Sequence, residues 1–275
     1  MLHLPQVTLC CVDTRTPQLA LDAIQRCTAG IRFAEVLLFT NVRSAPPAPP
    51  GVRYVDLRIA SVAAYSEFML RGIAPYIATS HWLVVQWDGF VLSPASWRDD
   101  FLSYDYIGAP WTYVQGDRSV GNGGFSLRSR RLLQALADPQ MVISHPEDVC
   151  ICHLNRDRLV QRHNIRFAPE ALAERFAYER RRVGHPTFGF HGLFNFGDVL
   201  EPQALQTLLS GLPAEMCRGL DAHDLAEELI RRGWLPAAAI VIDKRKQLGM
   251  NDRRSWRLRL RLWLARRRQK PGLSN

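Results

Sequence analysis

From the N-terminus to Leu92, apolar runs alternate with segments that have the spacing of an amphipathic helix. The apolar runs QVTLCCVDT, AEVLLFTN, VRYVDLR and HWLVVQWDGFVL are typical of buried strands, and the last of them breaks at Asp88-Gly89. Residues 16–31 and 61–77 predict helices, the first with Pro17 near its start and Gly30 at its end. This order predicts a mainly parallel sheet with helices on both faces.

The regular pattern ends after Leu92, where aromatic residues, aspartate and glycine become frequent. A helix is expected from His145 to Val160, and the leucine- and alanine-rich text beyond Val199 predicts further helices. We therefore predict a single α/β domain over residues 1–200. A helical C-terminal extension follows over residues 201–275, with a basic amphipathic tail at 253–270.

The formal charge of +9 is concentrated at the C-terminal end. Nine lysines and arginines and no acidic residue follow Asp252, which leaves 26 of the 35 basic residues against 26 acidic ones in the rest of the chain. A formally neutral body does not favour a nucleic-acid groove, so no nucleic-acid partner is expected. The tail suits an anionic surface or serves solubility alone.

The periodicity of the tail is ambiguous. In a helix, Leu258 and Leu262 lie among arginines, nearly opposite a face formed by Trp256, Leu260, Trp263 and Leu264, but residues 256–262 also alternate as in a strand. Tryptophan, leucine and arginine together favour an anionic membrane surface. We predict peripheral attachment to the inner face of the cytoplasmic membrane; the alternative is a solvated helix or a packed appendage.

The cysteines and the N-terminus predict a reduced, cytoplasmic protein. The six cysteines form no CxxC pair and suggest neither a zinc ribbon nor a disulfide framework. The start, MLHLPQVTLCCVD, lacks a basic n-region and a small-residue cleavage site. No apolar run approaches the ~18 residues that a membrane span needs.

Polar residues follow the predicted strands at the edge where open α/β sheets bind ligands. They are Asp13, Thr14, Arg15, Asn41, Asp88 and Gly89. The first strand is followed by VDTRTP, which lacks the glycines of a dinucleotide or P-loop motif. Asp88 suits a divalent cation or a ribose hydroxyl, since hard cations prefer oxygen ligands, but an Asp-Gly turn ending a strand explains it equally well.

Two later segments hold further candidates, each with a structural alternative. Glu147 and Asp148 follow Pro146, which is an ordinary helix start, yet either carboxylate could serve as a general base. His191 lies between glycines and aromatic residues, where it is either structural or a ligand. The group Cys150, Cys152 and His153 is better explained by two apolar-face thiols than by a metal site.

Four segments in order resemble a family of bacterial and fungal glycosyltransferases long catalogued as a domain of unknown function. They are VVQWDGFVLSPASWRDDFLSYDYIGAPW, VGNGGFSLRSRRLL, PEDVCICHLNRDRL and TFGFHG, and the resemblance covers residues 7–192. It implies a GT-A fold, which is a single Rossmann-like domain, and a hexosyltransferase-like enzyme that uses a nucleotide-sugar donor, a UDP-sugar. The acceptor is then a hydroxyl of a glycan or lipid-linked glycan, in bacterial cell-surface or capsular polysaccharide synthesis.

The resemblance also implies a metal site and a catalytic base. GT-A enzymes bind Mn²⁺ or Mg²⁺ and the donor diphosphate through a D-x-D motif; here Asp88 matches the second aspartate, and Gln86 replaces the first. His191 matches a late metal-binding histidine. Asp148, with Glu147 beside it, matches the base that deprotonates the acceptor in an inverting reaction. Asp13, Thr14, Arg15 and Asn41 would then lie near the nucleoside, with Gln86, Asp88 and Gly89 at the diphosphate.

The segment VGNGGFSLRSRRLL is similar to the acceptor-side strand of galactosyltransferases and Fringe-type enzymes. Ser126 stands where a GxGxxG motif needs its last glycine, so we assign the backbone of Asn122, Gly123 and Gly124, with Gly121, to close approach by a sugar. Trp111 and Phe125 would offer aromatic faces to the sugar, although Trp111 is equally compatible with the core. Arg128, Arg130 and Arg131 are assigned to the solvent face of the next helix.

Because Gln86 replaces the first aspartate of the D-x-D motif, a second function remains open. A catalytically inactive module of the same fold would bind a nucleotide sugar or glycan without transferring it. The presence of Asp88, the Glu147-Asp148 pair and His191 favours the enzyme.

Overall fold

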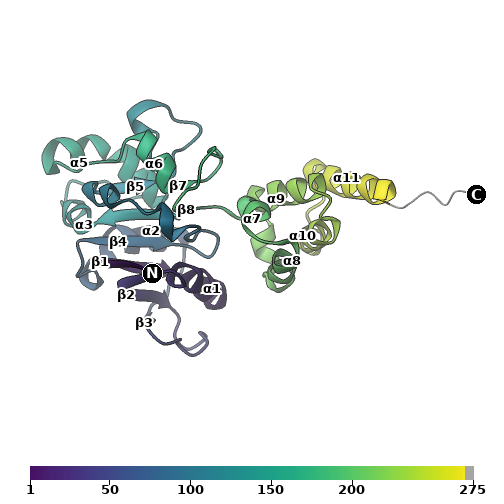
Figure 1. Cartoon of the computed structure of the whole chain (residues 1–275), viewed down its shortest axis with the longest axis horizontal. Helices are drawn as coiled ribbons and strands as arrows, with labels where there is room; N and C mark the ends of the chain where they lie inside the picture. Colours follow the sequence, from purple (N-terminus) through teal and green to yellow (C-terminus); the bar gives the residue numbers. More distant parts are fainter. Residues whose placement is uncertain (270–275) are drawn as a thin grey trace, which may run out of the picture. The chain divides into compact units, whose positions relative to one another are not determined.

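A computed structural model of the chain describes residues 1–269, which form two compact units, Met1–His191 and a second that begins at Gly192 (Figure 1). The division falls earlier than the boundary at residue 200 that the sequence suggested. Residues 193–199 form a 3-10 turn, η7 (Leu193–Asn195), and helix α7 (Phe196–Val199), and both contact α9 (Leu220–Arg231) of the second unit. The buried side chains of Leu193 and Phe196 explain why this segment folds with the helices.

The first unit is built on a six-stranded sheet in the order β3-β2-β1-β4-β6-β5. Its strands are β1 (Leu2–Val12), β2 (Ile31–Thr40), β3 (Arg53–Asp56), β4 (His81–Val85), β5 (Tyr106–Gly108) and β6 (Ser126–Ser129). β1 to β4 pair in parallel, and β6 runs antiparallel to both of its neighbours. The mixed α/β fold with a mainly parallel central sheet is therefore confirmed.

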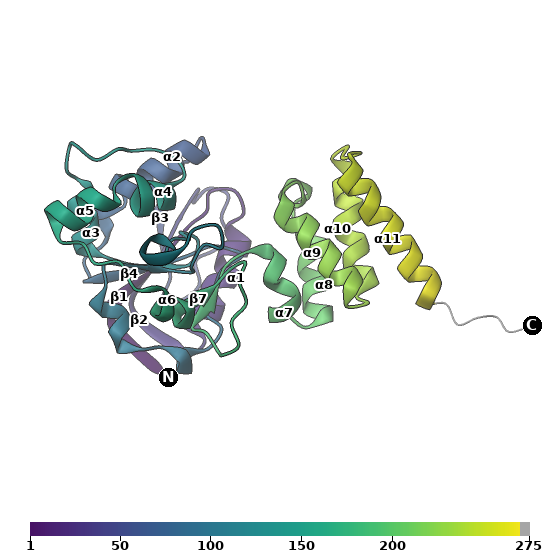
Figure 2. The same ribbon diagram turned by 90° about the horizontal axis from the view of Figure 1, so that it is seen from above.

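Helices cover both faces of this sheet (Figure 2). Helix α1 (Pro17–Thr28) links β1 to β2, and α2 (Val62–Glu67) links β3 to β4, which lies in the other direction across the sheet. Right-handed crossovers in opposite directions place the two helices on opposite faces. On the α2 face, Phe39, Trp82 and Val84 of the strands form a buried cluster with Met69 and Ile73.

The two long helices expected in this unit are interrupted. Residues 61–77 form α2, a π-helical turn η1 (Phe68–Gly72) and a 3-10 turn η2 (Ala74–Tyr76). Gly72 lies against the Phe68 ring, which a Cβ would approach to 2.6 Å, and Pro75 has no N–H to continue a helix. Residues 145–160 give α4 (Glu147–Val149), the π-helical turn η6 (Cys150–Leu154) and α5 (Arg156–His163).

The remaining elements of the first unit follow β4 in the chain. Helix α3 (Arg130–Leu136) follows β6, and α6 (Glu170–Phe176) precedes a two-stranded parallel sheet of β7 (Ala177–Tyr178) and β8 (Gly189–Phe190). Short 3-10 turns are η3 (Pro94–Ser96), η4 (Asp99–Ser103) and η5 (Gly116–Arg118). β4 ends at Val85, earlier than expected, because Gln86 and Gly89 exchange backbone hydrogen bonds and turn the chain at Asp88.

The second unit is helical, as the sequence predicted. It contains α7, α8 (Pro202–Gly211), the 3-10 turn η8 (Ala214–Cys217), α9, α10 (Leu235–Gln247) and α11 (Arg253–Gln269). The tail is thus a helix rather than a strand, and its first turn is capped by Asp252, which accepts hydrogen bonds from the backbone of Arg254 and Ser255. Lys270, the last basic residue of the predicted tail, lies outside the described residues. Residues 1–269 contain no helix whose length and apolar content would let it span a bilayer.

Candidate functional site

A cavity of about 470 Å³ opens at the carboxyl edge of the sheet. Six segments line it: Gln86 after β4, residues 111–113 after β5, residues 122–124 before β6, residues 146–148 at the start of α4, residues 179–180 after β7, and His191 after β8. Segments far apart in the sequence therefore meet at one site. This is the edge at which open α/β sheets bind ligands.

The glycine-rich turn before β6 is the centre of the site. A Cβ on Gly123 would lie 2.4 Å from Glu147 Oε1 and 3.1 Å from Asp148 Cβ, and one on Gly124 would lie 2.1 Å from His191 Nε2. A Cβ on Gly121 would lie 2.3 Å from the Trp111 ring. The protein's own side chains therefore require these glycines, whereas the sequence had assigned them to a bound sugar alone. Gly123 and Gly124 do line the cavity.

Replacing Gly124 with alanine should displace His191. Because the added methyl group would overlap the imidazole, we expect a loss of about 1–3 kcal/mol in the free energy of unfolding. Urea unfolding measures it, with Gly184→Ala as the control, since a Cβ there meets nothing within 4 Å. Equal stability of the two variants would contradict the close packing of His191 on this turn.

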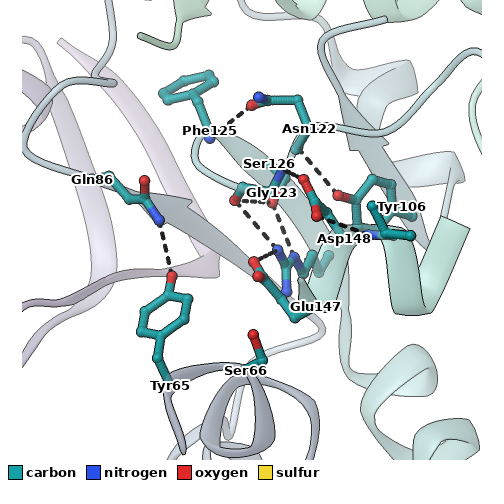
Figure 3. Close-up of polar contacts among 12 residues, drawn as sticks. Tyr65, Ser66, Gln86, Tyr106, Asn122, Gly123, Phe125, Ser126, Glu147 and Asp148 are labelled. Carbon is teal, nitrogen blue, oxygen red and sulfur yellow. Dashed lines mark hydrogen bonds and ion pairs between the residues drawn. The ribbon is translucent and has the colours of Figure 1, made fainter. Parts of the chain in front are cut away.

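Asp148 presents a fixed carboxylate to the cavity. Its Oδ2 accepts a hydrogen bond of 3.0 Å from the Gly123 N–H, and its Oδ1 accepts one of 2.8 Å from Val149 N–H (Figure 3). The side chain is half-buried and lines the cavity. An oriented carboxylate that a hydroxyl group can reach has the properties of a general base.

Glu147 has a different environment, although it also touches the cavity. It is buried and forms an ion pair of 3.1 Å with Arg128, whose side chain is fully buried. Arg128 lies opposite Trp82 and Tyr106 in the antiparallel register, and its guanidinium packs 5.2 Å and 5.4 Å from their rings. The placement of Arg128 on a solvent face was therefore wrong, because it is a residue of β6.

Arg130 and Arg131 do lie on the exposed side of α3, as expected. Both follow Ser129, whose hydroxyl caps the helix by accepting a hydrogen bond from the Leu132 N–H. Their exposure leaves Arg128 as the member of this arginine cluster that contacts the candidate site.

His191 is held by polar groups on both ring nitrogens. Nε2 lies 3.1 Å from Gln86 Oε1 and 3.6 Å from Asp88 Oδ1, while Nδ1 lies 3.2 Å from Glu179 Oε1 and 3.1 Å from Asn122 Nδ2. Burial lowers the pKa of His191, but the nearby carboxylates of Asp88 and Glu179 outweigh it and raise the pKa to about 10. Glu179 was missed from the sequence, because nothing in ERRRVGH distinguishes it from a solvated acid.

An NMR titration of the metal-free protein should separate two histidines. His191 is expected to stay protonated until its pKa of about 10, while burial, with Arg118 and Arg156 nearby, lowers the pKa of His153. The stability that His191 contributes is complete below its unfolded pKa of about 6.5 and is lost as the pH rises through about 10. The variant His191→Gln assigns the resonance, and a His191 that titrates below pH 7 would contradict the ion pairs described.

The donor atoms around His191 fit a divalent cation only in part. Asp88 Oδ1, Gln86 Oε1 and His191 Nε2 converge, but residues 1–269 contain no cluster of three or more His, Cys, Asp or Glu that could hold a metal. The imidazole would also have to lose its proton to act as a ligand. A cation here would therefore need most of its oxygen ligands from water and a bound phosphate, as Mg²⁺ commonly does.

The aromatic candidates divide between the cavity and the core. Trp111 is mostly buried yet lines the cavity, between the ring of Tyr113 and a parallel His153 imidazole at 4.9 Å. Phe125 is fully buried near Phe176 and Phe188, so its assignment to a sugar face was wrong. Tyr113, which is 71% exposed, is the aromatic face that the sequence reasoning missed. Its neighbour Thr112 shares the cavity wall.

The residues after β1 and β2 lie at the same sheet edge but do not line the cavity. The Asp13 carboxylate accepts hydrogen bonds from the backbone N–H groups of Arg15 and Thr16, and Asn41 Oδ1 accepts one from the backbone N–H of Arg43. Asp13 and Asn41 therefore each stabilise the turn that follows their strand. Thr14 belongs to the first of these turns. The parallel pairing of Cys11 with Val85 places the turn after β1 next to the end of β4, and the pairing of Val12 with Phe39 places the turn after β2 one strand further along the sheet.

The six cysteines are packed inside the fold. All six are buried free thiols, and Cys150 donates a hydrogen bond to the Val142 carbonyl. Burial raises the pKa of the Cys152 thiol. The C-x-C-H segment is therefore packed in the fold, with His153 stacked on Trp111.

The fold and the cavity define an α/β domain with a polar cavity at the carboxyl edge of its sheet. The chain belongs to the family described as "Protein of unknown function (DUF5672)", whose model matches residues 52–191 and so includes every residue that lines the cavity. None of the curated proteins matches the chain.

One solved structure similar to this chain is the mannosyltransferase PcManGT from Pyrobaculum calidifontis, in complex with GDP-Man and Mn²⁺. The match covers 98% of this chain and 83% of that chain, at 10% identity and a TM-score of 0.41. A likeness at this level carries no information about the chemistry of the cavity.

Proposed function

We propose that the chain is a glycosyltransferase that moves a sugar from a nucleotide-sugar donor to a hydroxyl of a glycan acceptor. The observation that carries the proposal is the position of Asp148. Its carboxylate is oriented by the Gly123 N–H and opens onto the same cavity as Gln86 and His191. The proposal is supported because a carboxylate that could accept a proton shares one space with polar groups that could face a departing diphosphate, as sugar transfer to a hydroxyl would require.

Each group has a defined task in this proposal. Asp148 accepts the proton of the acceptor hydroxyl. As the hydroxyl oxygen attacks the anomeric carbon of the donor sugar, the bond from that carbon to the diphosphate breaks. Tyr113 and Trp111 provide aromatic surface for the acceptor sugar. Glu147 holds the turn through Arg128 and positions Asp148. A single base opposite the donor favours inversion, which NMR of the anomeric proton of the product would test.

The cation and the donor belong to the same proposal. Asp88, Gln86 and His191 would hold Mn²⁺ or Mg²⁺ together with the donor phosphates, and a bound cation would neutralise charge on the departing nucleotide. Asp13, Thr14, Arg15 and Asn41 lie at the neighbouring strand ends, where the nucleoside of a UDP-sugar would bind. Gly89 permits the approach of His191, since a Cβ there would lie 3.0 Å from its ring.

A thermal-shift screen of nucleotide sugars, with and without Mn²⁺, tests this function. We expect one donor to raise the melting temperature, and a further rise with Mn²⁺ that Asp88→Ala abolishes. Free nucleotide should then be released from that donor by the wild type. No shift with any donor would contradict the proposal. A shift without nucleotide release would favour the alternative, a catalytically inactive module that binds the nucleotide sugar without transferring it.

A further inference from the structure

Helix α11 has an apolar face that the second unit does not cover. Trp256, Leu260, Trp263 and Leu264 are 58%, 38%, 47% and 41% exposed. Leu258 and Leu262 on the other side are buried, where α11 contacts α9 and α10. With about 3.6 residues per turn, the four exposed side chains share an arc of roughly 100°, nearly opposite the two buried leucines. They form one continuous stripe, which we call the tryptophan–leucine face.

Positive charge borders this face. The helix contains eight arginines and no acidic residue. Within residues 1–269, Arg261 is the one arginine of the helix that has a carboxylate partner, Glu227. Arg267 packs 3.9 Å from the Trp263 ring, so one cation lies directly on the exposed apolar stripe. The combination is an apolar surface with a surrounding excess of unneutralised charge.

We propose that the tryptophan–leucine face of α11 docks on an anionic phospholipid surface. Tryptophan and leucine favour the boundary between headgroups and acyl chains, and flanking arginines bind the phosphates of the same lipids. A second copy of the helix is a poorer occupant, because pairing would bring together two sets of eight like charges. The remaining face is committed to the helical unit through Leu258 and Leu262, so the exposed stripe is the part available to lipid.

Co-sedimentation of the full-length chain with vesicles tests the proposal. Vesicles of phosphatidylcholine mixed with phosphatidylglycerol should bind the protein at least about tenfold more tightly than pure phosphatidylcholine, since each arginine near the surface adds to the affinity. Raising the salt concentration should weaken the binding. Equal binding to both vesicle types would show that the arginines of α11 do not contribute to binding, and would overturn this part of the proposal.

The double variant Trp256→Ala/Trp263→Ala tests the apolar component, with Leu154→Ala/Leu220→Ala as its control. The control residues are 54% and 56% exposed, outside α11. We expect the tryptophan variant to bind the mixed vesicles about tenfold or more weakly and the control to bind as the wild type does. Unchanged binding by the tryptophan variant would overturn the proposal. So would a wild type that ignores both vesicles and dimerises through this face. Nucleotide release is measured separately, so this proposal can fail independently of the proposed transferase.

Discussion

The substitution Asp148→Asn should reduce sugar transfer by about 10²- to 10⁴-fold while donor binding is retained. The amide has nearly the same shape, and its oxygen can still accept the 3.0 Å hydrogen bond from Gly123 N–H, although its NH₂ group cannot replace Oδ1 as the acceptor for Val149 N–H. It cannot take a proton from the acceptor hydroxyl at neutral pH. The loss should therefore appear in kcat rather than in the thermal shift produced by the donor.

The measurement is the release of free nucleotide from the donor found in the thermal-shift screen. Asp157→Asn is the matched control, because Asp157 is exposed on α5 and pairs only across the surface with Arg118. Its turnover should equal that of the wild type. Full turnover by Asp148→Asn would show that this carboxylate is not the base, whatever the outcome of donor binding.

The second large effect is on stability. Arg128→Met should lower the free energy of unfolding of the first unit by about 3–5 kcal/mol, because it leaves the buried Glu147 carboxylate without its partner. The guanidinium also donates to the Gly123 carbonyl and packs between Trp82 and Tyr106. Hydrogen exchange of the amides of β4 and β6 reports on this unit directly.

Two further variants distinguish a lost ion pair from general damage. Arg130→Met makes the same chemical change at an exposed position of α3 and should cost less than about 0.5 kcal/mol. The double variant Arg128→Met/Glu147→Leu removes both charges and should recover much of the stability that the single variant loses. A double variant as unstable as the single one would show that packing, rather than the pair, dominates.

The apolar periodicity predicted the strands and the fold class because these depend on which face of each segment is buried. The parallel sheet, its flanking helices and the C-terminal helices follow from that pattern. The interruptions of the two expected helices at the π-helical turns η1 and η6 were not predicted, because the apolar spacing of these segments did not distinguish a continuous helix from an interrupted one. Likewise, the tail pattern fitted either a helix or a strand, and packing against α9 and α10 decided it.

The candidate site was predictable as a list of residues but not as an arrangement. Asp148, Gln86 and His191 could be proposed from their motifs, yet the contact of Gly123 with Asp148 and of Gly124 with His191 depends on chain segments far apart in the sequence. Glu179 and Tyr113 carry no local signal and enter the site only through the second sheet and the loop after β5.

Arg128 and Phe125 show most clearly which features could not be predicted from the sequence. In the sequence both stand in GNGGFSLRSRR, where a charged residue suggests solvent and an aromatic residue beside glycines suggests a ligand. The sequence by itself determined the order of strands and helices as far as the fourth strand, the neutral body with a basic tail, and the residue types of the candidate site. Only the tertiary structure decided that Arg128 is buried with Glu147, that Phe125 belongs to the core, and that Asp148 faces the cavity. The physical reason is that burial and pairing of a side chain are set by neighbours from distant parts of the chain, which no local pattern records.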